Sequence, residues 1–367
     1  MLRHDPSFDV AIIGAGPAGS AAAIELARAG RRTILIEKKH FPREKVCGGC
    51  LSGPATARLR QLLGPERPLP GVGVTEATLV IGSYWLTCRP NGTTRMVPRS
   101  VLDACLAEAA AAAGAQVRYG SPASLERGSA GWEVVLGDER ILAGTVLIAC
   151  GLSGLPHRLG IQARESRRRL IGQMWFQPAE PPLPPIGCIE LHWLRGGYVG
   201  LATPEADRCV VAIAVDAAEH STGHVFEYLR QRNPQASIWG ILPPDGPRRF
   251  NAIGTAGFPW MPERLGVDNV LLVGDAAGFE EPYTGEGIGQ AMRSAACAVR
   301  AILEDGKPLG RYTALMRGRH RAVMRRTRRV RRLLDLPLTH YLAQRWPVLP
   351  RGLLSRLMEQ IHVKGAL

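Results

Sequence analysis

A glycine-rich turn near the start of the chain constrains the fold more than any other feature. The turn consists of Gly14, Ala15, Gly16, Pro17, Ala18 and Gly19. A β-rich apolar run, residues 8–13, precedes it, and an alanine-rich helical stretch, residues 20–29, follows it. A second apolar run, residues 33–36, ends in Glu37. This order of strand, turn, helix, strand and acid is typical of a dinucleotide-binding unit, so we expect an α/β fold with a Rossmann-like domain.

Each part of this motif has a physical reason. Gly14 permits the tight turn, Gly16 lets the backbone approach a pyrophosphate, and Gly19 lets the helix pack closely on the strand. The helix N-terminus offers unpaired N–H groups and a partial positive charge to the phosphates. Glu37 lies where its carboxylate can accept hydrogen bonds from the ribose hydroxyls of adenosine. This motif alone does not distinguish FAD from NAD.

Two further segments have the character of cofactor-binding elements. Residues 269–273 predict an apolar strand that runs into Gly274 and Asp275, and a glycine-rich stretch then leads into a helix over residues 290–303. Between this segment and the N-terminal turn, Arg99 stands at the start of a helical pattern that continues to Ala113. A pure NAD enzyme has no need for the later strand–turn–helix segment, so that segment favours FAD.

These three segments resemble the geranylgeranyl reductase family, within the superfamily of aromatic-hydroxylase flavoproteins. The resemblance extends over roughly residues 8–305. It implies that Asp275, together with Gly274, holds the ribityl chain of FAD and that Arg99 contacts the cofactor. It also implies that the amides near Gly287 and Ile288 stabilise negative charge on the reduced flavin.

The loop after Glu37 strengthens this resemblance. It begins at Lys38, which we also assign to the cofactor site, and reaches Cys47, Gly48 and Gly49, which match a Lys-x-Cys-Gly-Gly segment that lies beside the flavin in the family. Cys47 is our candidate catalytic residue, although a packing role is an equal alternative. Cys47 and Cys50 also form a CxxC pair, which leaves a redox disulfide open. We predict no metal, because the remaining six cysteines form no second pair of that kind.

The remaining strands predict a substrate domain that interrupts the cofactor domain. Alternating apolar patterns occur within residues 75–97 and 171–257, as in an antiparallel sheet. Glu190 and His192 share one strand face, which suits an acid/base pair but is more common in an ordinary sheet face. We predict an FAD-binding domain from residues 1–74, 98–165 and 258–305, a substrate domain from residues 75–97 and 166–257, and a C-terminal helical segment from residues 306–367.

Charge and composition restrict the partners. The net charge is +14, and arginines are concentrated between residues 317 and 332, beside several leucines. A solvated helix face is one explanation, and contact with an anionic membrane surface or an acidic carrier protein is the other. No nucleic-acid-binding motif accompanies the arginines. With no signal peptide or membrane span in the sequence and no disulfide framework, we expect a cytoplasmic protein whose only membrane association is peripheral.

The resemblance predicts an FAD-dependent oxidoreductase that reduces C=C bonds of a hydrophobic substrate such as a prenyl lipid or a polyketide. Monooxygenation of an aromatic or polyketide substrate and a non-catalytic FAD-binding adaptor are the alternatives. The Trp-x-Trp-x-Ile-Pro motif of flavin halogenases is absent from the sequence. One departure concerns the electron donor: Cys150 stands where the superfamily has an Asp before Gly151. The donor is therefore either NADPH bound in another way or a redox protein.

Overall fold

The computed structural model describes residues 7–90, 93–128, 131–176, 185–205, 209–216, 225–242, 252–280, 283, 285–304 and 307–345. Residues 346–367 of the predicted C-terminal segment, and Pro282 and Thr284 of the second glycine-rich stretch, lie outside these ranges.

The N-terminal motif folds into the centre of a six-stranded sheet with the order β18-β19-β12-β1-β2-β8. The pairs among β19, β12, β1, β2 and β8 are parallel, and β18 pairs antiparallel with β19. The central strands are almost entirely apolar and buried, as expected where both faces of a parallel sheet are covered. The strands are β1 (Phe8–Ile13), β2 (Thr33–Ile36), β8 (Gln116–Arg118), β12 (Ala143–Ile148), β18 (Gly266–Val267) and β19 (Val270–Leu272).

Helices α1 (Pro17–Arg28), α3 (Arg99–Ala112) and α6 (Gly287–Glu304) pack side by side, with α1 between the other two. Helix α1 begins three residues earlier than the alanine-rich pattern predicts, because Pro17 suits the first helical position. Helix α6 also begins three residues early. A meander that the sequence did not predict packs against β12; its strands are β9 (Ser124–Gly128), β10 (Gly131–Leu136) and β11 (Glu139–Ile141).

A second sheet of seven strands has the order β17-β13-β16-β15-β14-β5-β6. It is antiparallel except where β14 pairs with β5. The sequence predicted an antiparallel sheet but not this parallel pair. The strands are β5 (Glu76–Ile81), β6 (Tyr84–Cys88), β13 (Ala163–Phe176), β14 (Cys188–Leu194), β15 (Gly197–Ala202), β16 (Cys209–Asp216) and β17 (Ala252–Pro262).

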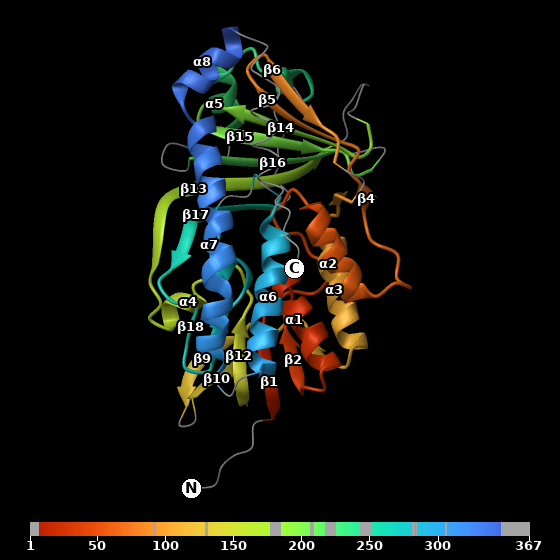
Figure 1. Ribbon diagram of the computed structural model, residues 1–367, viewed down its shortest axis with the longest axis vertical. Helices are drawn as coiled ribbons and strands as arrows, with labels where there is room; N and C mark the ends of the chain where they lie inside the picture. The colour runs from red at the N-terminus through yellow and green to blue at the C-terminus, as the bar shows by residue number, and fades with distance from the viewer. Residues whose placement is uncertain are drawn as a thin grey trace.

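The two sheets lie at opposite ends of the molecule, and the paired strands β13 and β17 run from one end to the other (Figure 1). Helix α7 (Pro308–Leu334) runs alongside both ends and continues into α8 (Pro337–Arg345) next to the second sheet. One face of that sheet is covered by α5 (Val225–Arg232) and by η2 (Ser237–Gly240).

Short elements connect the two ends. Strands β3 (Cys50–Leu51), β7 (Arg95–Met96) and β4 (Val72–Gly73) form a small sheet, and α2 (Gly53–Leu63) follows β3. Helix α4 (Leu155–Arg158) precedes β13, and the 3₁₀ helix η3 (Gly274–Ala277) follows β19. Strand β3 and the 3₁₀ helix η3 lie near the junction of the two ends, where the predicted cofactor residues meet.

Candidate active site

The glycine turn has the geometry that the motif requires. Gly14 has a φ of +105°, and a Cβ there would lie 2.7 Å from the Ala149 carbonyl oxygen. A Cβ at Gly19 would lie 1.9 Å from the carbonyl oxygen of Gly14. A Cβ at Gly16, in contrast, would meet only the Arg99 guanidinium, at 3.6 Å. Gly16 therefore presents an open side of the backbone at the start of α1, where no side chain caps the helix.

Glu37 lies at this turn, as predicted. Its carboxylate is buried and accepts hydrogen bonds from the backbone N–H of Ala15 at 3.1 Å and of Lys39 at 3.2 Å. Arg43 pairs with the same carboxylate at 3.2 Å. Glu37 is thus fixed beside the helix N-terminus, where an adenosine ribose would reach it.

Arg99 is held by a partner that the sequence analysis missed. Its guanidinium makes a bidentate pair with Asp103, at 2.8 and 2.7 Å, and both side chains are buried. Arg43 joins the pair through a contact of 3.0 Å with Asp103. Burial lowers the pKa of Arg99, but the Asp103 carboxylate more than offsets this and raises the pKa above its ordinary value. The spacing of four residues on one helix was the available signal for Asp103.

The second predicted segment reaches the same place. Gly274 has a φ of +65°, and its Cα comes so close to α1 that a Cβ would lie 3.0 Å from the Cβ of Ala18. Asp275 follows directly, and its carboxylate lies 3.8 Å from Nζ of Lys45, a residue that the sequence analysis did not assign. Gly287 and Ile288 form the first turn of α6, which packs against α1. The structure therefore brings the glycine turn, Asp275 and the α6 N-terminus together.

The cysteine loop lies next to these elements. The Gln173 side chain of β13 accepts a hydrogen bond from the Cys47 N–H at 2.9 Å, so a residue far along the chain fixes the loop. Gly49 has a φ of +66°, and a Cβ there would lie 2.6 Å from the Val97 carbonyl oxygen. A Cβ at Gly48 would meet nothing within 4 Å. Gly48 thus leaves open space, whereas Gly49 is fixed by packing.

The two cysteines of the loop have different surroundings. Burial raises the pKa of Cys50 to about 12, with a smaller contribution from Cys47. Cys50 also packs against Gly285, where a Cβ would lie 3.2 Å from its Sγ. The Sγ of Cys47 accepts a hydrogen bond from the Gly49 N–H at 3.4 Å. Because the thiolate is the reactive form, burial makes Cys50 less reactive than an exposed thiol.

A thiol, that of Cys150, follows directly after strand β12, as the sequence shows. Sγ of Cys150 lies 2.9 Å from Oγ of Ser153. Burial raises the pKa of Cys150, while Lys45 and Lys38 have a smaller, lowering effect. Lys38 itself is exposed. A thiol with a raised pKa cannot replace the carboxylate that the superfamily has at this point.

These residues fit FAD. The backbone has open space beside it at Gly16 and at Gly48, which lie on two different segments of the site. The N-terminus of α1 has no side-chain cap, and the Glu37 carboxylate is a hydrogen-bond acceptor held in place. A dinucleotide needs each of these features: room beside the backbone, donors for phosphate and an acceptor for ribose. Across the described ranges, no cluster of three His, Cys, Asp or Glu side chains has metal-binding geometry.

An aromatic cluster fills the space between the second sheet and α7. Trp193 and Tyr198 stack with centroids 5.1 Å apart, and the ring of Tyr283 stands edge-on to Trp193 at 5.2 Å. The Tyr283 hydroxyl donates to the carbonyl oxygen of Thr327 at 2.8 Å, and the indole N–H of Trp193 donates to Asp335 at 3.2 Å. Apolar side chains surround the cluster: Leu79, Ile81, Tyr84, Leu86, Val330 and Leu334.

The Glu190 and His192 pair lies away from this cluster. The His192 ring contacts the Glu190 carboxylate at 2.9 Å and is completely buried. Alternate residues of a strand point to opposite faces, so Glu190 and His192 face away from Trp193. The pair therefore belongs to the other face of the second sheet.

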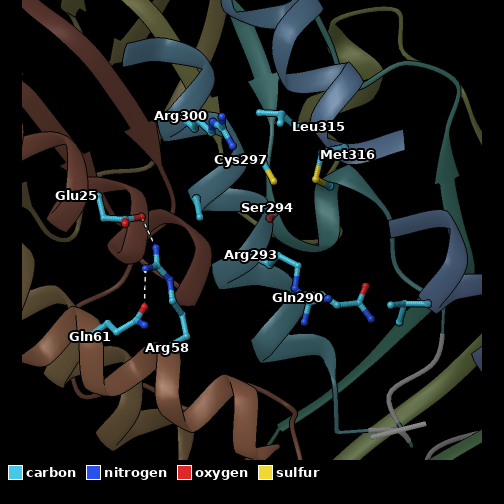
Figure 2. Close-up of a pocket in the computed structure, with 12 residues that line it drawn as sticks. Glu25, Arg58, Gln61, Gln290, Arg293, Ser294, Cys297, Arg300, Leu315 and Met316 are labelled. Atoms are coloured by element: carbon cyan, nitrogen blue, oxygen red, sulfur yellow. Dashed lines mark hydrogen bonds and ion pairs between the residues drawn. The ribbon is translucent and has the colours of Figure 1, made fainter. Parts of the chain in front are cut away.

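A separate cavity of about 560 Å³ lies on the outer side of α6, between α1, α2 and α7. Figure 2 shows Arg293 and Gln290 projecting from α6 toward it. On the opposite wall, Arg58 pairs with Glu25 at 2.5 Å and donates to Gln61 at 3.1 Å. No residue that we assign to the cofactor lines this cavity.

Comparisons with known proteins agree with this geometry. Residues 7–307 match the family model described as FAD binding domain. The chain is 28% identical over 340 residues to menaquinone reductase of Mycolicibacterium smegmatis, which covers 81% of this chain and 77% of that protein. It is also 28% identical over 335 residues to digeranylgeranylglycerophospholipid reductase of Methanocella arvoryzae, with 84% and 83% covered.

The fold is that of flavin-dependent enzymes. The solved structure of the flavin-dependent brominase Bmp2 superimposes with a TM-score of 0.74 at 20% identity, over 97% of this chain and 93% of that one. In the part of the chain that the structure describes, every helix is too short or too polar to cross a membrane. The family model matches most of the length of the chain, and the cofactor residues converge in the structure. The chain therefore belongs to the FAD binding domain family and is an FAD-dependent oxidoreductase.

Proposed function

We propose that the protein saturates a C=C bond of a hydrophobic substrate, either a prenyl lipid or a polyketide-like molecule. The observation that carries the proposal is the buried aromatic cluster, which the chain joins to the cysteine loop. Tyr283 belongs to the aromatic cluster, and Gly285, two residues later, packs on Cys50. A hydrocarbon chain has no polar group to recognise, so a protein binds it through apolar and aromatic side chains such as these. The two reductases named above, both similar over most of this chain, support the same reaction class.

The chain's own residues supply the remaining parts of the reaction. FAD, if bound in its reduced state, would supply a hydride for one alkene carbon. We assign the proton for the other carbon to the Cys47 thiol, which solvent then reprotonates, so that atoms and charges balance. Gln173 positions this loop through its bond to the Cys47 N–H. The aromatic cluster and the Leu and Ile side chains around it orient the substrate and exclude water.

The reducing equivalents come from NADPH or from a redox protein. Cys150, which contacts Ser153, stands just after β12 in the place of the Asp that the family resemblance leads us to expect, so NADPH would have to bind in another way. Steady-state assays with NADPH, and with a reduced ferredoxin or flavodoxin in its place, identify the donor.

Anaerobic single-turnover kinetics test the reaction. The bound flavin is reduced photochemically without oxygen and mixed with menaquinone or with a geranylgeranyl lipid. We expect the flavin to reoxidise and mass spectrometry to detect a product two hydrogens heavier. Oxygen consumption in proportion to a hydroxylated product would instead identify a monooxygenase. A reduced flavin that persists with every substrate, in air and without it, would point to an adaptor.

Two cysteine variants test the role of Cys47. We expect Cys47→Ala to bind FAD normally and to slow product formation about a hundredfold, the usual size of a general-acid effect. Cys50→Ala is the matched control from the same loop, because burial disfavours ionisation of its thiol. Equal rates for Cys47→Ala and the wild type, with flavin retained, would show that another group donates the proton.

A further inference from the structure

The charged side chains of helix α7 are all basic. No Asp or Glu occurs between residues 306 and 334, whereas ten arginines lie within α7. Two of the arginines near its end are neutralised inside the fold: Arg328 makes a bidentate pair with Glu280 at 2.9 Å, and Arg331 pairs with Asp335 at 3.2 Å. The Arg328–Glu280 pair anchors one side of the helix to the rest of the protein, whereas Arg331 and Asp335 both belong to the end of α7.

Four other arginines form what we call the α7 arginine face: Arg325, Arg326, Arg329 and Arg332. All four are exposed, and none has a carboxylate partner among the residues that the structure describes. Spacings of three, four and seven residues place them on one side of the helix. A surface helix that is only solvated usually carries acidic side chains three or four residues from its basic ones. Within α7 no acidic residue stands at these spacings from the four arginines, and Asp335, just after the helix, pairs with Arg331.

Large apolar side chains are exposed beside this face. Leu333 is 39% exposed and lies one turn after Arg329 on the same side of α7. Leu336, Leu338 and Tyr341 follow around the turn into α8, at 47%, 60% and 47% exposure. Of the nine large hydrophobic residues that are exposed in the described ranges, four lie within these nine positions. We call these four the α8 apolar corner.

We propose that the α7 arginine face and the α8 apolar corner together bind the surface of an anionic phospholipid bilayer. Guanidinium groups pair with lipid phosphates, and leucine and tyrosine side chains enter the boundary between headgroups and acyl chains. Nucleic acid would pair with the arginines but would gain nothing from exposed leucines. An acidic protein is the other macromolecule with suitable charge, and the leucines at the end of a protruding helix favour the bilayer.

This surface lies on the opposite side of α7 from the aromatic cluster. Val330 and Leu334, on the buried side of the same helix segment, pack against the aromatic cluster. Tyr283 is tied to α7 through the carbonyl oxygen of Thr327. A protein bound through this surface therefore brings the aromatic cluster within one helix of the lipid phase. This last consequence rests on the proposed function, but the binding itself does not.

Vesicle sedimentation of the full-length FAD-loaded protein tests the surface. Vesicles of phosphatidylcholine alone are compared with phosphatidylcholine vesicles that contain phosphatidylglycerol. We expect binding to the anionic vesicles only, weakened by salt because the arginine contribution is screened. Equal binding to both kinds of vesicle, or to neither, would overturn the proposal, as would selective binding to an acidic carrier protein.

Charge variants locate the surface. Arg325→Gln, Arg326→Gln, Arg329→Gln and Arg332→Gln combined should weaken binding to anionic vesicles at least tenfold, since each arginine near such a surface contributes about fivefold. The matched control removes four charges elsewhere: Arg31→Gln, Arg89→Gln, Arg127→Gln and Arg140→Gln. If the control weakens binding as much as the α7 variant, net charge and not this surface is responsible.

An apolar variant separates insertion from simple charge attraction. Leu336→Ser with Leu338→Ser should weaken vesicle binding about tenfold while the salt dependence persists, because the arginines remain. Both side chains are exposed, so the folded state and the bound flavin should be unaffected. Unchanged binding by this variant would overturn the apolar part of the surface. None of the substituted residues contacts the proposed flavin site, so loss of binding with anaerobic turnover intact distinguishes this proposal from the proposed reaction.

Discussion

At the scale of single residues, the cofactor site depends on glycines that are required for two different reasons. Gly14, Gly19 and Gly49 are required because a Cβ would collide with backbone. Gly16 and Gly48 are different, because a Cβ there would enter the space that we assign to FAD. A sequence motif shows both kinds as the same letter, and only the structure separates them.

The adjacent pair Gly48 and Gly49 tests this distinction. We expect Gly49→Ala to lower the free energy of unfolding by about 1–3 kcal/mol, because its φ is positive and its Cβ would meet Val97. Gly48→Ala should leave the melting temperature of the apoprotein unchanged and weaken FAD binding about tenfold. Thermal unfolding and flavin fluorescence titration measure the two effects. Wild-type FAD affinity in Gly48→Ala would place the cysteine loop away from the cofactor.

The buried Arg99–Asp103 pair is the second test at this scale. Replacing Asp103 with Asn leaves two guanidinium groups without their shared carboxylate, and Arg99 is buried. We expect a loss of about 3–5 kcal/mol in urea unfolding. Glu139→Gln, which breaks the exposed Arg118–Glu139 pair, is the control and should cost under about 1 kcal/mol. Similar losses in the two variants would contradict a structural role for the buried pair.

At the scale of elements, local chemistry made the strands and helices around the glycine turns predictable. The strand over residues 33–36 lies where the sequence placed it, and α3 ends one residue before the predicted position. The sequence did not predict the meander β9–β11, because its short strands carry mixed polar residues without strict alternation. It also missed the early start of β13, where the run of charged residues 164–169 has no strand pattern. Pairing with β17 makes that segment a strand.

Helix α8 gives a prediction about acidity. Burial, with a smaller effect of Arg195, lowers the pKa of His340 below its ordinary value. The folded state therefore favours neutral His340, and the unfolded state takes up the proton first as the pH falls. Stability is retained above the ordinary histidine pKa of 6.5 and declines below it. Melting temperatures of the wild type and of His340→Gln across this range should show a smaller decline in the variant. Parallel curves would show that another group is responsible.

At the scale of the whole molecule, the cofactor site is assembled from segments that lie far apart in the sequence. The residues of the three motifs could be named in advance, since each motif is local. The residues that hold the motif residues in place could not be named in advance. Gln173, Arg43 and Lys45 act through contacts that only the fold creates. The domain boundaries stay a prediction, and strands β13 and β17 continue across two of the proposed limits.

Hydrogen exchange tests this assembly directly. Saturation with FAD should protect residues 14–19, 45–49, 274–280 and 285–289 together, because these described segments border the site. A hundredfold excess of FAD over its Kd should also stabilise the protein by about 2.7 kcal/mol. Protection limited to residues 14–19 would mean that only the adenine nucleotide half is held there, and the flavin half of the site would have to be placed elsewhere.

The parallel pairing of β5 with β14 has a consequence for how the protein is made. Glu76 of β5 pairs with Cys188 of β14, and Val80 pairs with His192. Because these partners lie far apart in the sequence, β5 leaves the ribosome long before β14. Translation adds roughly 5–20 residues per second, so the hairpin of β5 and β6 waits several seconds for its neighbour. During that interval its apolar side chains and the unpaired edge of β5 face solvent or a chaperone. Slower elongation therefore lengthens the period in which nascent chains can aggregate.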